Sequence, residues 1–153
     1  MRKLLVLCMC ALVLVACYDN APKESDAGLP IGRVLLGGGE NPVFVDVEIA
    51  ETKEQRERGL MGRDSLAEDA GMMFMYFEPV MHGFWMKDTK IPLSVAFIGE
   101  EQTILEIIDM DPCTEATCPS YTPTVEYTAA LEVNQGAFER WGVEVGDPVT
   151  LLR

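Results

Sequence analysis

The stretch from Gly83 to Pro92, GFWMKDTKIP, combines side chains that small-molecule sites use. Trp85, Lys87 and Thr89 follow one another closely, and strand alternation places Trp85 and Lys87 on the face opposite their apolar neighbours. An aromatic face, an ammonium group and a hydroxyl at one rim suit a small polar ligand. The alternative is that Trp85 covers the open end of the fold and binds nothing.

Two arginines, Arg56 and Arg63, flank the glycine turn at Gly59. Guanidinium groups form bidentate clamps on carboxylates or phosphates, so both arginines are candidates for the same ligand. The alternative is that they pair with the acidic surface or bond exposed carbonyls. The candidate binding residues are therefore Arg56, Arg63, Trp85, Lys87 and Thr89.

The chain carries no recognisable set of nucleophile and base, because motifs such as Gly-x-Ser-x-Gly and His-Glu-x-x-His do not occur and His82 is its only histidine. We predict no catalytic residue, no metal and no cofactor. A carboxylate-based hydrolase acting on envelope glycans stays open, and it needs two carboxylates about 5 to 10 Å apart beside an aromatic platform. Cu(I) handling also stays open, and it needs Met81, Met86 and His82 to converge at one exposed point.

The N-terminus has the pattern of a bacterial lipoprotein signal over residues 1–16. Arg2 and Lys3 precede an apolar run from Leu4 to Ala16, which reaches about 20 Å as a helix and is too short to cross a bilayer core of about 30 Å. The run ends in LVAC, which looks like a lipobox, so we predict that Cys17 is lipidated. The alternative is an ordinary signal peptide beside a chance cysteine.

Cys113 and Cys118 are the cysteines that remain after the signal and Cys17 are set aside. On the oxidising side of a membrane a disulfide is the default for such a pair. A Cys-x₄-Cys metal site would need two further ligands, which the intervening Thr-Glu-Ala-Thr does not supply. We predict a structural disulfide.

Residues 17–40 are acidic and rich in proline and glycine, and they predict a lipidated cysteine followed by a flexible tether. Val34 to Leu36 could dock on the domain as a first strand. The formal net charge of −13 argues against nucleic acid and anionic lipid surfaces as partners, since both require a basic face. The folded domain is predicted over residues 41–153.

Short strands separated by turns dominate the domain. Val43 to Ile49 alternates apolar and polar residues, and Thr52 with Gln55 forms a capping-box pattern that opens a short helix ending at Gly59. Further strands are predicted over 72–77, 84–86, 93–98, 103–110, 125–133 and 149–152, with a second short helix around 137–141. We predict an all-β, jelly-roll-like sandwich or barrel with two short helices.

Four segments in order are jointly distinctive: RxxGLMGR from Arg56, DxGMMF from Asp69, FWMKDTxIPL from Phe84 and ALEVNxG from Ala130. They closely resemble domain-of-unknown-function family 192, and the resemblance covers about residues 43 to 152. It implies an all-β domain that is often exported. Asp88 stands where the family usually has Asn, and Ser94 where it usually has Asp. If either position carries the family's function, that function is lost or altered here.

The sequence therefore favours a cell-envelope protein, lipid-anchored to a bacterial membrane and facing the extracytoplasmic side. We interpret its domain as a non-catalytic binding or structural module. Its expected partners are the membrane, through the lipid anchor, and a small polar ligand or envelope component.

Overall fold

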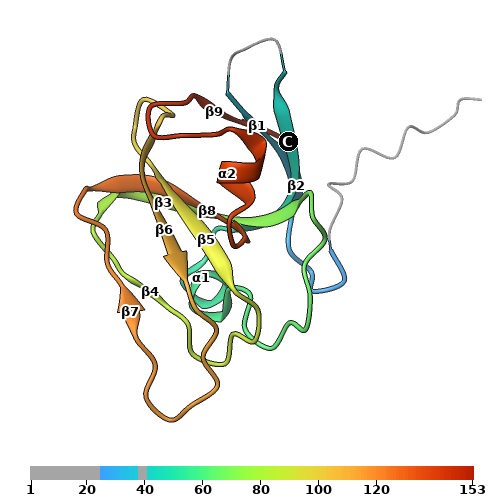
Figure 1. The fold of residues 1–153 in the computed structure, drawn as a ribbon, viewed down its shortest axis with the longest axis vertical. Coiled ribbons are helices and arrows are strands. Elements are labelled where there is room, and N and C mark those ends of the chain that lie inside the picture. The colour runs from blue at the N-terminus through green and yellow to red at the C-terminus, as the bar shows by residue number, and fades with distance from the viewer. Residues whose placement is uncertain (1–24, 38–40) are drawn as a thin grey trace, which may run out of the picture.

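The computed structural model describes residues 25–37 and 41–153, so the predicted signal peptide and Cys17 lie outside the described residues. Within these residues, no helix is long and apolar enough to cross a membrane. The regular structure of the domain consists of β-strands and two short helices, joined by turns and longer loops (Figure 1). The strands are β1 (Ile31–Leu36), β2 (Val43–Ala50), β3 (Ala70–Val80), β4 (Phe84–Trp85), β5 (Leu93–Ile98), β6 (Ile104–Met110), β7 (Ser120–Tyr121), β8 (Tyr127–Asn134) and β9 (Val149–Leu152).

One curled sheet of seven strands has the order β6-β5-β8-β3-β2-β1-β9, and β4 pairs with β7 separately. Every pair in the large sheet is antiparallel except β2 with β3, which are joined by the crossover containing α1 (Lys53–Arg58). The two ends of the sheet meet: Val149 N donates to Gln102 O at 2.8 Å, and a bridge joins Thr103 with Pro148. The result is a half-barrel, which confirms the all-β prediction with two short helices.

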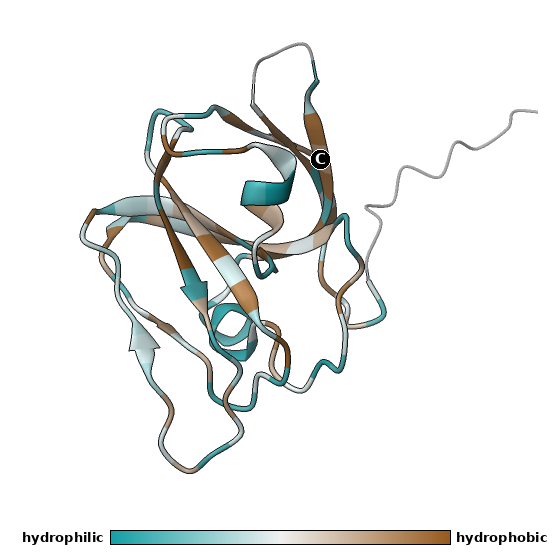
Figure 2. Cartoon of the chain, in the orientation of Figure 1, coloured by the Kyte–Doolittle hydropathy of each residue, from teal (hydrophilic) through white to brown (hydrophobic). Residues whose placement is uncertain are grey.

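The sheet buries side chains on both faces, because separate elements cover each one. One face packs with α2 (Ala137–Trp141), whose Phe138 is buried among valines and leucines of the strands. The other face holds an aromatic cluster that includes Phe74, Phe84 and Phe97, covered by α1, β4 and the loops around them. Figure 2 shows apolar residues along the strands and hydrophilic residues on α1.

Helix α1 begins as the sequence predicts. Thr52 Oγ1 accepts from Gln55 N at 3.2 Å, while the Gln55 side chain accepts from Thr52 N at 2.9 Å, which completes the capping box. Gly59 ends the helix at a φ of 46°, and a Cβ there would lie 3.4 Å from the Phe74 ring. The turn after α1 therefore lies directly against the aromatic cluster.

The sheet starts earlier in the chain than the domain predicted over residues 41–153. Strand β1 lies in the segment predicted as a tether, and its residues pair with both β2 and β9. Val34 and Leu36 are buried. The prediction that this short apolar run docks on the domain as a first strand is therefore confirmed. The sheet thus begins at Ile31, N-terminal to the predicted start of the domain at Asn41.

Candidate functional site

A pocket of about 640 Å³ opens between α1, the following turn, and the strands β3, β4 and β8. Its walls combine aromatic rings, aliphatic side chains and charged groups. They are formed by Lys53, Arg56, Glu57, Arg58, Gly59, Leu60, Met61, Phe74, Tyr76, His82, Gly83, Phe84, Trp85, Thr89 and Glu132. Phe74 and Phe84 of the aromatic cluster form part of this wall. Their rings pack edge to face, with their centroids 5.0 Å apart.

Glu132 on β8 is the unusual member of this lining. Its neighbours in register are Met72 on β3 and Val95 on β5, both part of the buried apolar cluster. The residue is only 5% exposed, and among the described residues no hydrogen bond or ion pair reaches its carboxyl group, whose oxygen atoms keep a little exposure to the open pocket. Buried carboxylates are ordinarily paired, so an unpartnered one in the wall of a pocket points to a ligand.

Burial raises the pKa of Glu132 to about 8, because an apolar environment disfavours the charged form. The carboxyl group is therefore largely protonated at neutral pH in the empty pocket. A raised pKa of this kind is typical of functional sites in clefts. A ligand that pairs with the ionised form would reverse the shift.

Arg56 is held rigidly at the side of the pocket. Its Nη1 donates to the carbonyl oxygens of Glu51 at 2.6 Å and Met75 at 2.9 Å, and its Cζ lies 4.7 Å from the centroid of the Tyr76 ring. Burial raises the pKa of Tyr76, while the nearby Arg56 charge opposes the rise and Glu132 adds to it. Arg56 therefore bonds backbone carbonyl groups, as the alternative interpretation of this residue predicted. Its side chain nevertheless lines the pocket.

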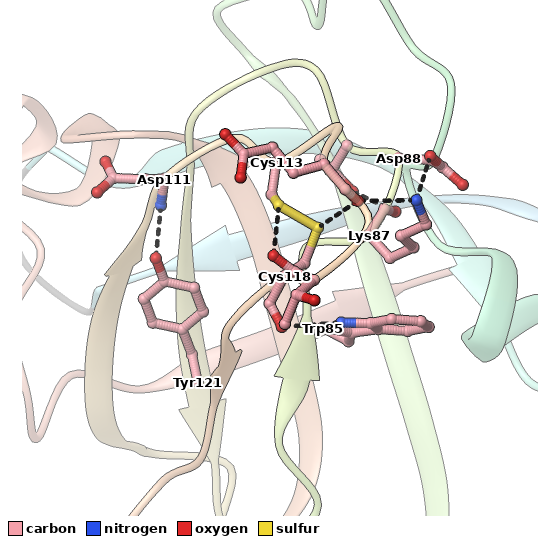
Figure 3. The surroundings of a disulfide bond; sticks show 10 residues. Trp85, Lys87, Asp88, Asp111, Cys113, Cys118 and Tyr121 are labelled. Atoms are coloured by element: carbon pink, nitrogen blue, oxygen red, sulfur yellow. Dashed lines mark hydrogen bonds and ion pairs between the residues drawn. A yellow bond between two sulfur atoms is a disulfide. The ribbon is translucent and has the colours of Figure 1, made fainter.

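Trp85 lies at the mouth of the pocket, 53% exposed, while Phe84 and Met86 on either side of it are buried. The alternation expected along this segment is confirmed. The indole Nε1 donates to the carbonyl oxygen of Cys118 at 3.2 Å, so the tryptophan is fixed against the disulfide loop (Figure 3).

Cys113 and Cys118 form the disulfide that the sequence predicts, with their Cα atoms 5.8 Å apart. The bridge closes a loop that holds the segment after β4 in place (Figure 3). Lys87 Nζ donates to Glu115 O in this loop at 3.0 Å, and Cys113 N donates to Thr89 O at 2.9 Å. The loop therefore braces the wall of the pocket that carries Trp85 and Thr89.

The structure brings together three of the five candidate binding residues, Arg56, Trp85 and Thr89, around one pocket. Lys87 does not line it, because its ammonium group is bound to the Glu115 carbonyl and to Asp88 at 3.1 Å. Arg63 lines a different, open groove, where it forms an ion pair with Glu48. This ion pair confirms the alternative interpretation of Arg63, in which it pairs with an acidic residue.

The requirement set for Cu(I) handling is not met. Met86 is buried in the core at 1% exposure, whereas Met81 is 50% exposed, so the two sulfur atoms do not converge with His82 at one exposed point. The hydrolase alternative has a partial match. Glu57, the second carboxylate that lines the pocket, is exposed and lies 3.6 Å from Lys53.

Glu132 was not among the candidates from the sequence, although it stands in the segment ALEVN that carried the family resemblance. The available signal was the run from Ala129 to Val133, which is apolar on both faces except for this residue. A strand of that kind is buried on both sides, so its one acid must be buried too. A buried acid then requires either a partner or a function.

Comparison with known proteins identifies the chain's relatives. A crystal structure of a protein of unknown function from Novosphingobium aromaticivorans DSM 12444 is 30% identical, with a TM-score of 0.77 over 86% of this chain and 94% of that one. A Sinorhizobium meliloti 1021 protein described as a "putative transcription regulator" is 31% identical, with a TM-score of 0.71 over 80% of this chain and 95% of that one. No curated protein matches. The model of the family DUF192, described as an uncharacterized ACR, matches residues 34–151, so the chain belongs to domain-of-unknown-function family 192.

Proposed function

We propose that this protein is a lipid-anchored envelope module that binds a small organic ligand in the pocket between α1 and β8. The single observation that carries the proposal is the unpartnered carboxyl group of Glu132, a residue only 5% exposed, in the wall of a pocket of about 640 Å³. Small-ligand sites typically have volumes of about 300 to 1,000 Å³, with mostly apolar walls and a few polar groups that fix orientation. This pocket has that size and that lining.

The anchoring part of the proposal rests on the N-terminal sequence and on the disulfide. The lipobox-like LVAC ending at Cys17 supports lipidation, and several acyl chains would hold the domain durably at a membrane. The Cys113–Cys118 bridge supports an extracytoplasmic location, because such bonds persist in oxidising compartments.

Regulation of transcription, which is the description given to the S. meliloti protein, is not carried over to this chain. Its formal net charge is −13, whereas a protein that binds nucleic acid neutralises phosphates with lysine and arginine. An acidic surface is compatible with small organic ligands and with envelope components.

A thermal-shift screen of small polar and amphipathic compounds tests the binding function. Trp85→Ala should weaken every compound that binds the pocket, at little cost to stability, because the indole is already 53% exposed. Phe77→Ala is the matched control, since Phe77 is 96% exposed and does not line the pocket. If no compound raises the melting temperature, or if the hits bind both variants equally, the pocket is not the binding site.

A second candidate function, hydrolysis of envelope glycans, is favoured by one observation. The pKa of Glu132 is raised to about 8, as a general acid requires, and Glu57 lines the same pocket beside Trp85. The test is the release of reducing ends from cell-wall glycan, compared between the native protein and Glu132→Gln. Release that the variant lacks would favour the hydrolase over the non-catalytic module.

A further inference from the structure

The pocket contains one acidic group, Glu132, that no cationic side chain pairs with among the described residues. Glu132 is surrounded by Met72, Val95 and the aromatic cluster, and among the described residues no cation or donor contacts it. Ionising this carboxyl group in the empty pocket is costly, so it stays largely protonated at neutral pH, and a bound cation would offset the cost of ionisation. The pocket therefore favours a ligand that brings a positive charge to Glu132.

The rest of the wall suits a cation with an organic body. The rings of Phe74, Tyr76, Phe84 and Trp85 line the same pocket as Glu132. Aromatic faces attract ammonium groups through the ring quadrupole, and the effect is strongest where water is excluded. A carboxylate among aromatic rings is a recognition set for an organic ammonium ion.

Arg56 limits where such a cation can lie. Its guanidinium is fixed over Tyr76 and bonded to two carbonyl groups, so it cannot turn to pair with Glu132 in place of a ligand. Two positive charges repel, so the ammonium end has to lie at Glu132, with the apolar body along Phe84 and Trp85. The end of the ligand near Arg56 is then neutral or acidic.

Building on the proposed binding function, we infer that the pocket binds an organic ammonium compound, whose charged nitrogen pairs with Glu132 and whose apolar body packs on the aromatic wall. Binding displaces the proton of the Glu132 carboxyl group to the buffer and leaves a carboxylate–ammonium pair. No covalent bond to carbon forms or breaks.

The exchange of a proton for the ligand makes the affinity depend on pH. The pKa of Glu132 in the empty pocket is about 8, so the affinity for an ammonium ion should rise about tenfold per pH unit up to about pH 8 and then level off. The other titratable or charged groups that line the pocket are Lys53, Arg56, Glu57, Arg58, Tyr76 and His82. His82→Gln therefore has to accompany the experiment, to show that the histidine is not the source of the pH dependence.

The test uses three probes of one shape: 2-phenylethylammonium, neutral 2-phenylethanol and anionic 3-phenylpropanoate. Their affinities for the full chain in neutral detergent are measured by calorimetry between pH 6 and pH 8. The ammonium probe should bind tightest and gain affinity with pH, and Glu132→Gln should weaken it at least tenfold at pH 8. Glu101→Gln, the same change in the turn between β5 and β6, should leave it unaltered, and both variants share the micelle, so partitioning of the probe cancels.

Three results would overturn the inference: equal affinity for the alcohol or the carboxylate, an affinity for the ammonium probe that Glu132→Gln leaves intact, or no binding of the ammonium probe at all. In each case the thermal-shift screen separates the two proposals. Hits that are lost in Trp85→Ala would keep the binding function and reject only the ammonium class. A screen without such hits would reject both.

Discussion

The buried carboxyl group of Glu132 makes the stability of the fold depend on pH in a defined direction. Its pKa is raised from 4.5 to about 8 by burial, so the folded chain keeps a proton that the unfolded chain loses at lower pH. The free energy of unfolding therefore falls as pH rises from about 4.5 to about 8. Glu132→Gln removes the titrating group and keeps its size, so this decline should disappear in the variant.

The magnitude follows from the size of the pKa shift. One pH unit between the two pKa values corresponds to about 1.4 kcal/mol, so the native protein should lose about 3 kcal/mol between pH 4.5 and pH 7. At pH 7 Glu132→Gln should be the more stable protein by up to that amount, equivalent to a melting temperature roughly 10 °C higher. A substitution at a ligand-binding residue that stabilises the fold is the expected signature of a function that costs stability.

The assay is urea unfolding followed by far-UV circular dichroism at pH 5, 6, 7 and 8, with Glu101→Gln as the control for loss of one negative charge. Other groups with shifted pKa values act outside this range. The raised pKa values of Tyr76, Tyr127 and Arg33 operate above pH 10, and the pKa values of Asp46, lowered by Arg33, and Glu54, lowered by backbone hydrogen bonding, lie below their ordinary values. Parallel curves for the native protein and Glu132→Gln would refute the reasoning, because Glu132 would then ionise equally well in both states.

Three further predictions concern the anchor, the loop and the sheet. Cys17→Ala should abolish acyl labelling and partition into detergent, and unchanged labelling would exclude lipidation at this cysteine. Replacing Cys113 and Cys118 by serine should lower the free energy of unfolding in urea by about 2 kcal/mol, since the bridge closes a short loop; two free thiols in the unreduced native protein would contradict this. Ser94→Ala should cost about 1 to 3 kcal/mol in the same assay, because Gly136 N donates to the hydroxyl of the buried Ser94 at 2.9 Å, and an unchanged midpoint would show that water replaces the hydroxyl.

Local sequence patterns predicted the individual strands and helices, because residue spacing and capping decide where these elements form. The capping box at Thr52 and the hairpin of β5 with β6 were readable from residue types and spacing. The parallel pairing of β2 with β3 and the sheet order were not, since they depend on which distant strands meet. The pairing of β1 between β2 and β9 likewise depends on both neighbours, and its own segment resembles a tether in composition.

The site was predicted in part, for a related reason. Arg56, Trp85 and Thr89 stood out by residue type, and the fold brings them to one pocket although they come from α1, β4 and the turn after it. Lys87 and Arg63 stood out equally, but local partners bind both of them elsewhere. The residue type alone does not distinguish Glu132 from the other acidic residues of the chain, because what sets it apart is its burial.

The two departures from the usual family pattern fall on residues whose structural roles are clear, and neither lines the pocket. Asp88 has a φ of 54°, in the left-handed region that Asn and Asp tolerate better than other side chains, so the exchange of one for the other keeps the turn. Ser94 is hydrogen-bonded to Asp109 on the neighbouring strand and accepts from Gly136 N ahead of α2. Both roles are structural, since Asp88 occupies a turn and the Ser94 side chain links neighbouring segments. The two departures therefore leave Glu132 and the aromatic wall of the pocket unchanged, and the proposed binding function does not depend on them.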